Sequence, residues 1–319
     1  MTTERPALAM DIGGTKLAAA TVEPGGRLSA WAQVPTPRDV DADQLWRTVE
    51  MLLDRVLGQA RITAVGELAG VGAGCGGPMQ WPAGVVSPLY IPAWRSFPLR
   101  TRLRERFGSI PVRVHNDAIC LVVGEHWRGA GRGRDNVLGM VISTGVGGGL
   151  ILDGRLVEGA SGNAGHIGHV VVDADCGPPC LCGGRGCLEA IARGPALVAW
   201  AQDEGWRPGQ ADATASELAA DAAHGHPVSL AAMRRAGHAL GVAISSATLL
   251  CDLEVVSIGG GLSQAGAVLF DPLEESLRAH TRMQFARQVR VVAAALGQSA
   301  GLVGAAALIF AGDRYWTGD

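Results

Sequence analysis

The sequence predicts an α/β protein of two lobes that close on a shared cleft. Two segments, residues 8–22 and 136–152, each have the pattern of a strand, a glycine turn and a second strand, and they lie in different halves of the chain. Apolar strand-like runs alternate with segments of helical spacing between and after them. A chain of 319 residues is long enough for two domains and a large core.

The composition excludes several classes of protein. Hydrophobic residues make up 48% of the chain and charged residues 18%, which is typical of a globular protein and not of a disordered one. The net charge of −3 and the pI near 6.2 indicate no basic surface for nucleic acid. The apolar run at residues 301–312 is too short to span a bilayer, and the first residues lack a signal-peptide pattern. We therefore expect a cytoplasmic protein with no membrane partner.

The first glycine turn lies within residues 8–22. It joins an aspartate at the end of one strand to a lysine at the start of the next: Asp11, Gly13, Gly14, Thr15 and Lys16. Two glycines let backbone N–H groups approach a phosphate, the threonine adds a hydroxyl donor, and the aspartate could hold Mg²⁺ through water. Plain hairpin turns have the same pattern, so this segment alone leaves both interpretations open.

The next segments predict one packing helix and two loops. Residues 41–58 form an amphipathic helix. Residues 68–78 formally match a dinucleotide fingerprint, but prolines follow where that motif needs a helix. We therefore predict a tight glycine loop there, including Gly77, that lines a ligand cleft. In an extended loop that follows, Trp94 is expected to pack, whereas Tyr90 could face a sugar or pack.

Asp117 is predicted at the junction of a strand and a helix. A basic helix over residues 98–107 comes first, with four arginines on its solvated side: Arg100, Arg102, Arg104 and Arg106. A short strand, residues 112–114, then leads to Asn116 and Asp117, and residues 118–127 form the next helix. A carboxylate in this position stays ionised and faces a cleft, which suits a general base acting on a hydroxyl. A helix cap is the alternative role.

Residues 136–152 repeat the pattern of the first turn. Thr144, Gly145 and Gly147 lie in the loop between two apolar runs. Two such turns are more informative than one, because the first can hold the far end of a polyphosphate and the second the near end. A third glycine turn follows a buried strand and suits a nucleoside base or ribose. It consists of Gly259, Gly260 and Gly261.

Three cysteines and a histidine lie within the glycine-rich residues 162–189. They are His169, Cys180, Cys182 and Cys187. Three thiolates and one imidazole form a complete tetrahedral set for structural Zn²⁺, with no position left for water. Buried thiols and disulfides are the alternatives, but the segment is too rich in glycine for a core, and nothing suggests secretion. Cys176 could compete as a ligand, although the spacing favours the other three.

A metal ion bound in this cysteine loop would also fix two side chains that could bind a ligand. His166 lies three residues before one expected ligand, and Glu189 lies two residues after another. A polar loop that presents a carboxylate and imidazoles suits the hydroxyls of a sugar.

The remaining segments predict packing elements. Residues 190–201, 217–223 and 238–250 have the spacing of helices, and residues 289–294 that of a strand. Residues 301–311 are apolar on nearly all sides, which predicts a buried final helix. Three further cysteines are expected to be packed: Cys75, Cys120 and Cys251.

Together these motifs resemble the ROK family of sugar kinases, which share the two-lobed actin/hexokinase/Hsp70-type ATPase fold with ribonuclease H-like lobes. The matching motifs cover nearly the whole chain. They are DIGGTK (11–16), NDA (116–118), STGVGGG (143–149), GH (168–169), CLCGGRGCLE (180–189) and GGGL (259–262). The cysteine motif is very specific, whereas the glycine turns alone are not.

The resemblance implies a small N-terminal lobe, residues 1–117, completed by a C-terminal helix at about 301–319. Residues 118–300 would form the large lobe, with the zinc loop and a dimerisation surface. The implied reaction transfers the γ-phosphoryl of MgATP to a hexose 6-hydroxyl, with Asp117 as the base. The implied nucleotide contacts come from the three glycine turns, and the implied sugar contacts are Gly77, Asn116, Asp117, His166, His169 and Glu189. The implied assembly is a homodimer or homotetramer.

Two positions depart from the family pattern. The family usually has glutamate at the position of His166 and asparagine near the position of Tyr90, both close to the sugar. A neutral imidazole donates or accepts one hydrogen bond at a time, whereas a carboxylate only accepts. Histidine also occurs at this position in actinobacterial members, so His166 still permits glucose. The change at Tyr90 is the stronger sign of an unusual sugar, for which kanosamine, a 3-amino-glucose, is one candidate.

Other functions are less consistent with the sequence. The family includes sugar-responsive transcription repressors, but these carry a helix-turn-helix domain before the first glycine turn, and Asp11 leaves no room for one. Polyphosphate-dependent glucokinases of the family lack the cysteine loop. A metal-binding module without catalysis does not explain the paired glycine turns. The expected acceptor therefore stays open among glucose, kanosamine and N-acetylmannosamine.

Overall fold

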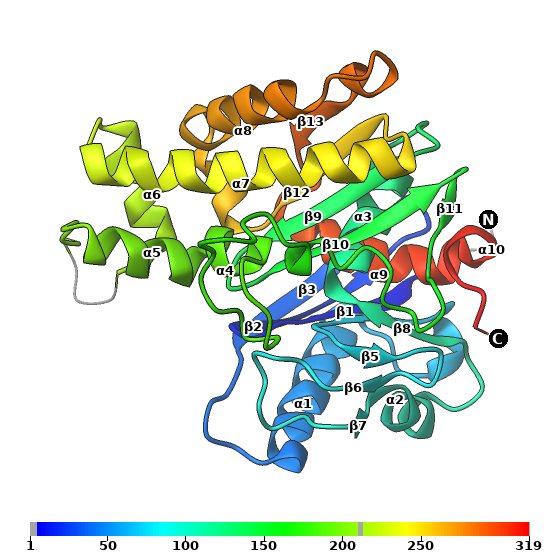
Figure 1. Cartoon of the computed structure of the whole chain (residues 1–319). Coiled ribbons are helices and arrows are strands. Elements are labelled where there is room, and N and C mark those ends of the chain that lie inside the picture. Colours follow the sequence, from blue (N-terminus) through cyan, green and yellow to red (C-terminus); the bar gives the residue numbers. More distant parts are fainter. Residues whose placement is uncertain (1–4, 210–212, 319) are drawn as a thin grey trace.

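The computed structural model describes residues 5–209 and 213–318, and two five-stranded mixed sheets form its centre (Figure 1). The first sheet has the order β3-β2-β1-β4-β8: β1 (Ala7–Ile12), β2 (Lys16–Val22), β3 (Leu28–Pro35), β4 (Gly70–Cys75) and β8 (Val112–Asn116). The second has the order β11-β10-β9-β12-β13: β9 (Val137–Ile142), β10 (Val146–Leu152), β11 (Arg155–Leu156), β12 (Val255–Gly259) and β13 (Arg290–Ala293). Residues 1–4, 210–212 and 319, which include both ends of the expected small lobe, lie outside this description.

The two sheets share one pattern of strand pairing. β1 pairs antiparallel with β2 and parallel with β4, and β9 pairs antiparallel with β10 and parallel with β12. Each of the two predicted glycine turns joins the antiparallel pair of its sheet. A three-stranded sheet extends the first lobe and consists of β5 (Met79–Gln80), β6 (Val85–Val86) and β7 (Phe97–Pro98). The α/β architecture expected from the sequence is therefore confirmed.

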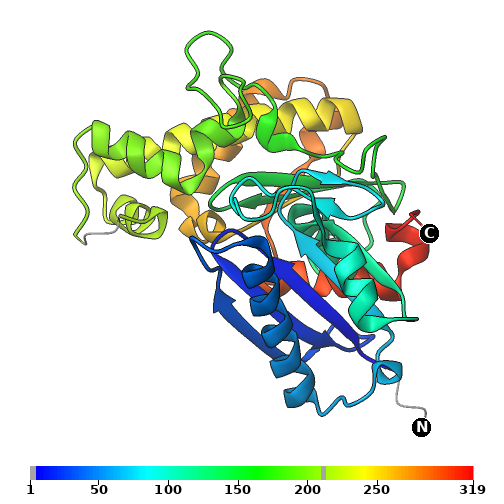
Figure 2. The ribbon, with the colours of Figure 1, turned by 90° about the horizontal axis from the view of Figure 1, so that it is seen from below.

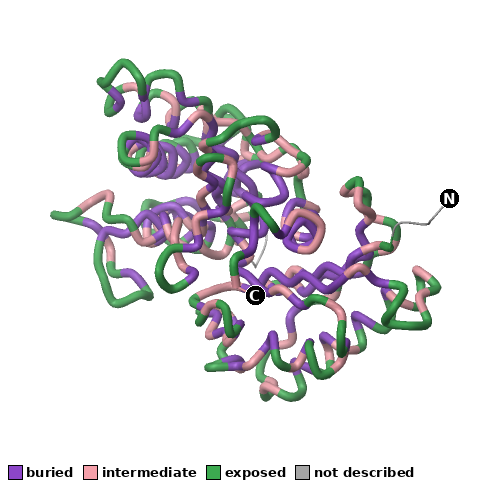
Figure 3. Tube along the Cα trace, turned by 90° about the vertical axis from the view of Figure 1, so that its right-hand side faces the viewer, coloured by how far each residue is buried: buried purple, intermediate pink, exposed green. Residues whose placement is uncertain are grey.

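Helices cover the outer faces of the sheets and fill the space between them. The helices are α1 (Ala42–Ala60), α2 (Leu99–Phe107), α3 (Asp117–Arg128), α4 (Leu188–Ala192), α5 (Gly194–Asp203), α6 (Ala215–Ala223), α7 (Pro227–Cys251), α8 (Ala267–His280), α9 (Ala300–Phe310) and α10 (Gly312–Tyr315). α1 and α2 lie on the first lobe, α5 to α8 lie on the second, and α3 and α9 lie between the sheets (Figures 1 and 2). Buried backbone is concentrated in the strands and the central helices (Figure 3). Among the described residues, no helix has the length and apolar character needed to cross a bilayer.

Several element limits differ from those that the sequence predicts. α7 begins eleven residues before the expected start at residue 238, with Pro227 at its first position and the His226 side chain as its cap. Its first half is rich in alanine and glycine, so the apolar period there is weak. β3 and α8 had no predicted counterpart. β3 is an exposed edge strand, and α8 contains Pro272 and four charged residues, which dilute the apolar pattern.

The glycine-rich segment at residues 68–78 corrects one expectation. It was predicted as a tight loop, but Gly70–Cys75 is the fully buried strand β4, between β1 and β8. Its glycines are needed because α9 lies directly on the strand: a methyl group on Gly72 would be 1.9 Å from the Ala305 carbonyl oxygen. Only the residues after the strand, including Gly76 and Gly77, line the cleft.

The basic helix α2 corrects another expectation. Arg100 was predicted on the solvated side but is only 5% exposed. Its Nε donates to the Val112 carbonyl at 2.9 Å and its Nη1 to the Pro82 carbonyl at 2.9 Å, so it joins α2 to the first sheet. The other three arginines reach solvent, and two of them form ion pairs with α1: Arg102 with Asp43, and Arg106 with Asp54.

α3 and α9 are in direct backbone contact between the two sheets. A methyl group on Gly304 would lie 1.6 Å from the Cys120 carbonyl oxygen, and one on Gly124 would lie 2.4 Å from the Ala300 carbonyl oxygen. α9 also packs on β1 and β4 of the first sheet. The expected lobe boundary after residue 117 falls one residue into α3.

We predict that Gly304→Ala destabilises the fold by about 3 kcal/mol, because the helices must separate to admit the methyl group. Gly58→Ala is the matched control. A methyl group on Gly58 would meet no atom within 4 Å, so this change in α1 should stabilise the protein by up to about 1 kcal/mol. Urea unfolding of both variants measures the difference. Equal unfolding midpoints for Gly304→Ala and the wild type would show that α3 and α9 leave room for a side chain.

Candidate functional site

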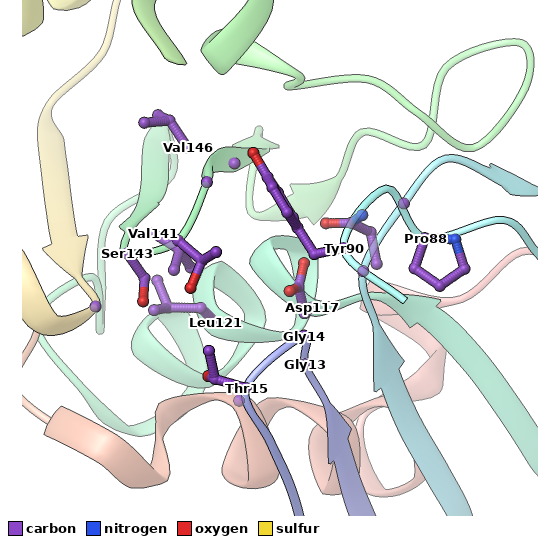
Figure 4. A pocket seen from close by; sticks show the side chains of 18 of the residues that line it. Gly13, Gly14, Thr15, Pro88, Tyr90, Asp117, Leu121, Val141, Ser143 and Val146 are labelled. Atoms are coloured by element: carbon purple, nitrogen blue, oxygen red, sulfur yellow. The ribbon is translucent and has the colours of Figure 1, made fainter. Parts of the chain in front are cut away.

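A cleft of about 400 Å³ lies between the two lobes and collects most of the residues that the sequence singled out (Figure 4). Sixteen of them line it: Asp11, Gly13, Gly14, Thr15, Lys16, Gly77, Asn116, Asp117, Thr144, Gly145, Gly147, His166, His169, Glu189, Gly260 and Gly261. Gly259 does not, because it ends the buried strand β12, where a methyl group would be 2.5 Å from Leu121 Cδ1. The three expected cysteine ligands lie behind the cleft wall and do not line it.

The cleft also contains residues that the sequence analysis missed. Gly297 and Gln298, just before α9, and Gly301, in its first turn, line the cleft. Lys16 Nζ donates to Gln298 Oε1 at 2.7 Å, which ties the strand after the first glycine turn to this segment. A glycine–glutamine pair just before the apolar final helix is the only sequence signal, and it is weak without the tertiary contact.

Asp117 is the first residue of α3 and lines the cleft beside the first glycine turn and Tyr90 (Figure 4). Asn116 is the N-cap, and the Ala118 N–H lies within hydrogen-bond distance of both Asn116 Oδ1, at 3.0 Å, and Asp117 Oδ1, at 2.7 Å, so the two residues share the capping role. Burial raises the pKa of Asp117 to about 6, and the nearby negative charge of Asp11 adds to this. Burial also raises the pKa of Asp11, while Lys16 opposes that shift.

The first two glycine turns expose unpaired N–H groups to the cleft. The first turn is held from outside by Thr36, whose Oγ1 donates to the Gly13 carbonyl at 2.6 Å and whose N–H donates to the Thr15 carbonyl at 3.1 Å. The second is closed by Ser143 N–H donating to the Gly145 carbonyl at 2.9 Å. Four N–H groups in these turns donate to no acceptor among the described residues: those of Gly14, Thr15, Thr144 and Gly145. Such groups suit phosphate oxygens.

At the other end of the cleft, polar side chains from three segments converge near the Gly77 loop. A methyl group on Gly77 would lie 2.6 Å from Asn116 Nδ2 and 3.4 Å from His166 Nε2, so these three residues meet. Burial lowers the pKa of His166, which favours the neutral imidazole. Glu189 is 4% exposed, and its Oε2 accepts from the Val146 N–H at 2.9 Å. These donors and acceptors suit the hydroxyls of a sugar.

The four expected metal ligands lie together beside the cleft. The ligand atoms of His169, Cys180, Cys182 and Cys187 all lie within 4.8 Å of one another. The Cys180 Sγ to His169 Nδ1 distance is 3.7 Å, and the Cys182 Sγ to Cys187 Sγ distance is 3.8 Å. A tetrahedral zinc ion with Zn–S bonds of about 2.3 Å places its sulfurs about 3.8 Å apart, so the set fits Zn²⁺.

The backbone of the loop brings the ligands together. Pro179 pairs with Arg185, and Cys180 N–H donates to the Gly184 carbonyl at 2.9 Å, which forms a tight hairpin. Cys176 lies outside the ligand set, is exposed, and donates its N–H to Asp173 Oδ1. His169 is in both the ligand set and the cleft lining, so the metal would fix a cleft residue directly.

Comparisons with known proteins show what this chain is similar to. A sequence model of the ROK family matches residues 7–311. The glucokinase of Thermotoga maritima is 34% identical over 318 residues, which cover 95% of this chain and 96% of that protein. The N-acetylmannosamine kinase of Citrobacter koseri is 33% identical over 96% of this chain and 99% of that protein. The structure of a ROK family glucokinase from Streptomyces griseus, in complex with glucose and AMPPNP, has a TM-score of 0.82 at 31% identity, covering 95% of this chain and 98% of that chain.

We predict that Cys182→Ala removes bound zinc, because three ligands and a gap replace a closed tetrahedral set. Cys176→Ala is the matched control, since Cys176 lies in the same loop but outside the ligand set. Elemental analysis of the purified variants measures metal per chain. We expect zinc in the wild type and in Cys176→Ala, and loss of zinc and of most sugar affinity in Cys182→Ala. Zinc-free wild-type protein with full activity would contradict the assignment.

Proposed function

Because the chain belongs to the ROK family and is a sugar kinase, we propose that it transfers the γ-phosphoryl group of MgATP to the 6-hydroxyl of glucose or a glucose-like amino sugar. Its fold is the two-lobed actin/hexokinase-type fold that the sequence resemblance implied. In this proposal the nucleotide and the sugar bind in the one cleft between the lobes.

One observation carries the proposal: Asp117 lies between two sets of groups that suit the two substrates. On one side are the unpaired N–H groups of the glycine turns, and on the other is the cluster of Gly77, Asn116 and His166. A methyl group on Gly76 would be 3.9 Å from Asp117 Oδ2, so the carboxylate reaches the sugar side of the cleft. Phosphoryl transfer depends on such positioning more than on covalent catalysis.

Asp117 acts in this mechanism as the general base. Its carboxylate accepts the proton of the 6-hydroxyl as the hydroxyl oxygen forms its bond to the γ-phosphorus and the bond to ADP breaks. Asn116 Nδ2, His166, His169 and Glu189 orient the sugar. The first two glycine turns hold the polyphosphate through their N–H groups, and Gly260 and Gly261 face the nucleoside.

Two metal ions would support these residues. Asp11 lies in the cleft with a raised pKa, so its carboxylate would be stabilised by a cation, and it would hold Mg²⁺ through water. The magnesium ion supplies neutralisation of phosphate charge. The zinc ion is structural, because its four protein ligands leave no open position.

The identity of the sugar rests on fewer observations. Glucose is the first candidate, because glucokinases are among the similar proteins. The alternatives are kanosamine and N-acetylmannosamine, the second because an N-acetylmannosamine kinase is equally similar. A phosphorylation screen that follows ADP release from all three sugars tests the choice. No ADP release with any hexose would overturn the proposal.

We predict that Asp117→Asn lowers kcat by about 10²- to 10⁴-fold while sugar binding persists, because the amide keeps the shape but accepts no proton. Steady-state kinetics and calorimetric titration with the sugar measure the two effects. Asp203→Asn, an exposed aspartate at the end of α5, is the control and should keep wild-type turnover. Near-normal turnover by Asp117→Asn would remove Asp117 as the base.

The raised pKa of Asp117, about 6, predicts the pH dependence of the reaction. A general base works in its ionised form, so kcat/KM, which reports the ionisation of the ligand-free protein, should be constant above this pKa and should fall about tenfold per pH unit below it. An ordinary aspartate would keep full activity down to about pH 5. The pH profile of kcat/KM across this range distinguishes the two cases. Constant kcat/KM down to pH 5 would contradict the assignment.

A further inference from the structure

Two buried polar atoms in the cleft have no hydrogen-bond partner among the described residues. They are the hydroxyl oxygen of Tyr90 and Oε1 of Glu189. A buried polar group without a partner is costly, and native proteins contain few of them. Two in one binding cleft indicate that a ligand completes their hydrogen bonds.

The two side chains meet at the second glycine turn. A methyl group on Gly145 would lie 2.7 Å from Glu189 Oε2, 2.8 Å from Tyr90 Cε2 and 3.4 Å from the Tyr90 hydroxyl oxygen. Glu189 is held in place, because its Oε2 already accepts from the Val146 N–H. The phenol is therefore close to a fixed carboxylate that has one oxygen left to accept a hydrogen bond.

The chemical roles of the two groups are complementary. Burial and the nearby charge of Glu189 raise the pKa of Tyr90 to about 12, so the phenol stays protonated and can donate. A carboxylate can only accept. A ligand hydroxyl between them would accept from Tyr90 and donate to Glu189. A hydrogen atom, a fluorine or an ether in its place could not satisfy both.

Tyr90 has space to make way for such a hydroxyl. Figure 4 shows its ring extending across the cleft, with the hydroxyl toward the turn before Val146. The same ring borders a second cavity of about 400 Å³, lined by residues 36–40 and 91–93 as well. A shift of the ring toward this cavity would open the gap between the phenol and Glu189.

We propose that Tyr90 determines specificity: together with Glu189 it recognises one hydroxyl of the acceptor sugar, which inserts between the two side chains. This inference rests on the proposed function and adds a residue at which this chain departs from the family pattern. The substrate class is a pyranose with a free hydroxyl at that carbon. An analogue that lacks it leaves two buried groups unpaired, which is a strong form of discrimination.

The test removes the Tyr90 hydroxyl and one sugar hydroxyl, separately and together, and measures whether their effects on kcat/KM depend on each other. The wild type and Tyr90→Phe are assayed with glucose and its 2-, 3- and 4-deoxy analogues, or with the same series of whichever proposed sugar is the better substrate. At one carbon, the loss in kcat/KM on removing the sugar hydroxyl should be roughly tenfold smaller in Tyr90→Phe, because its partner is already gone. At the other carbons the losses should be unchanged.

Tyr315→Phe is the matched control. It changes the only other tyrosine of the chain, whose hydroxyl is 2.7 Å from His126 Nδ1, outside the cleft. It should keep the wild-type pattern of losses at every carbon. Ligand-free Tyr90→Phe should be at least as stable to heat as the wild type, since it loses an unpaired hydroxyl.

Two results would overturn the inference alone. One is an active wild type in which removal of each sugar hydroxyl lowers kcat/KM by the same factor as in Tyr90→Phe, at every carbon. The other is a Tyr90→Phe variant with a lower thermal midpoint, which would make the hydroxyl a structural group. A wild type that phosphorylates none of the proposed sugars would overturn the proposed function, and this inference with it.

Discussion

The backbone contact between α3 and α9 positions the groups of the cleft. Gly124 and Gly304 let the two helices touch without intervening side chains: Gly304 lies against Cys120, and Ala300 at the start of α9 lies against Gly124. One N-terminus begins with Asp117, and the other brings Gly301 to within reach of Asp11, where a methyl group would be 3.1 Å from Oδ2. A helix pair with larger residues at this crossing would separate the proposed base from the proposed magnesium site.

This arrangement places like charges in a confined space. Asp11 and Asp117 are both half-buried, and the negative charge of Asp11 disfavours ionisation of Asp117. Lys16 is the cation close to them in the cleft lining. A cleft of this kind is less stable when empty than when cations and hydroxyl donors occupy it, so part of the binding free energy comes from relief of unpaired groups. The unpaired oxygen of Glu189 is in the same condition.

On the sugar side of the cleft, the cysteine loop must keep its shape without a hydrophobic core of its own. Residues 181–185 are all exposed, so the loop has little apolar surface to hold its shape. Four ligand atoms within 4.8 Å of one another provide the constraint instead. His169 connects the ligand set to the cleft, and Glu189 follows Cys187 at the start of α4, so a metal ion in the loop would set the position of both.

The sequence by itself determined the α/β class, the two glycine turns and the cysteine–histidine set, because local spacing defines each of them. It also singled out Asp117, since a strand end followed by a helix start is a local pattern. Only the tertiary structure showed that glycines within residues 68–78 form a central strand. Glycine is needed there because α9, which is distant in the sequence, packs directly on the strand. The same holds for buried Arg100 and for Gln298, whose partners lie far away in the chain. The unpaired atoms of Tyr90 and Glu189 are also visible only in the tertiary structure, because an atom becomes buried only when remote segments of the chain enclose it.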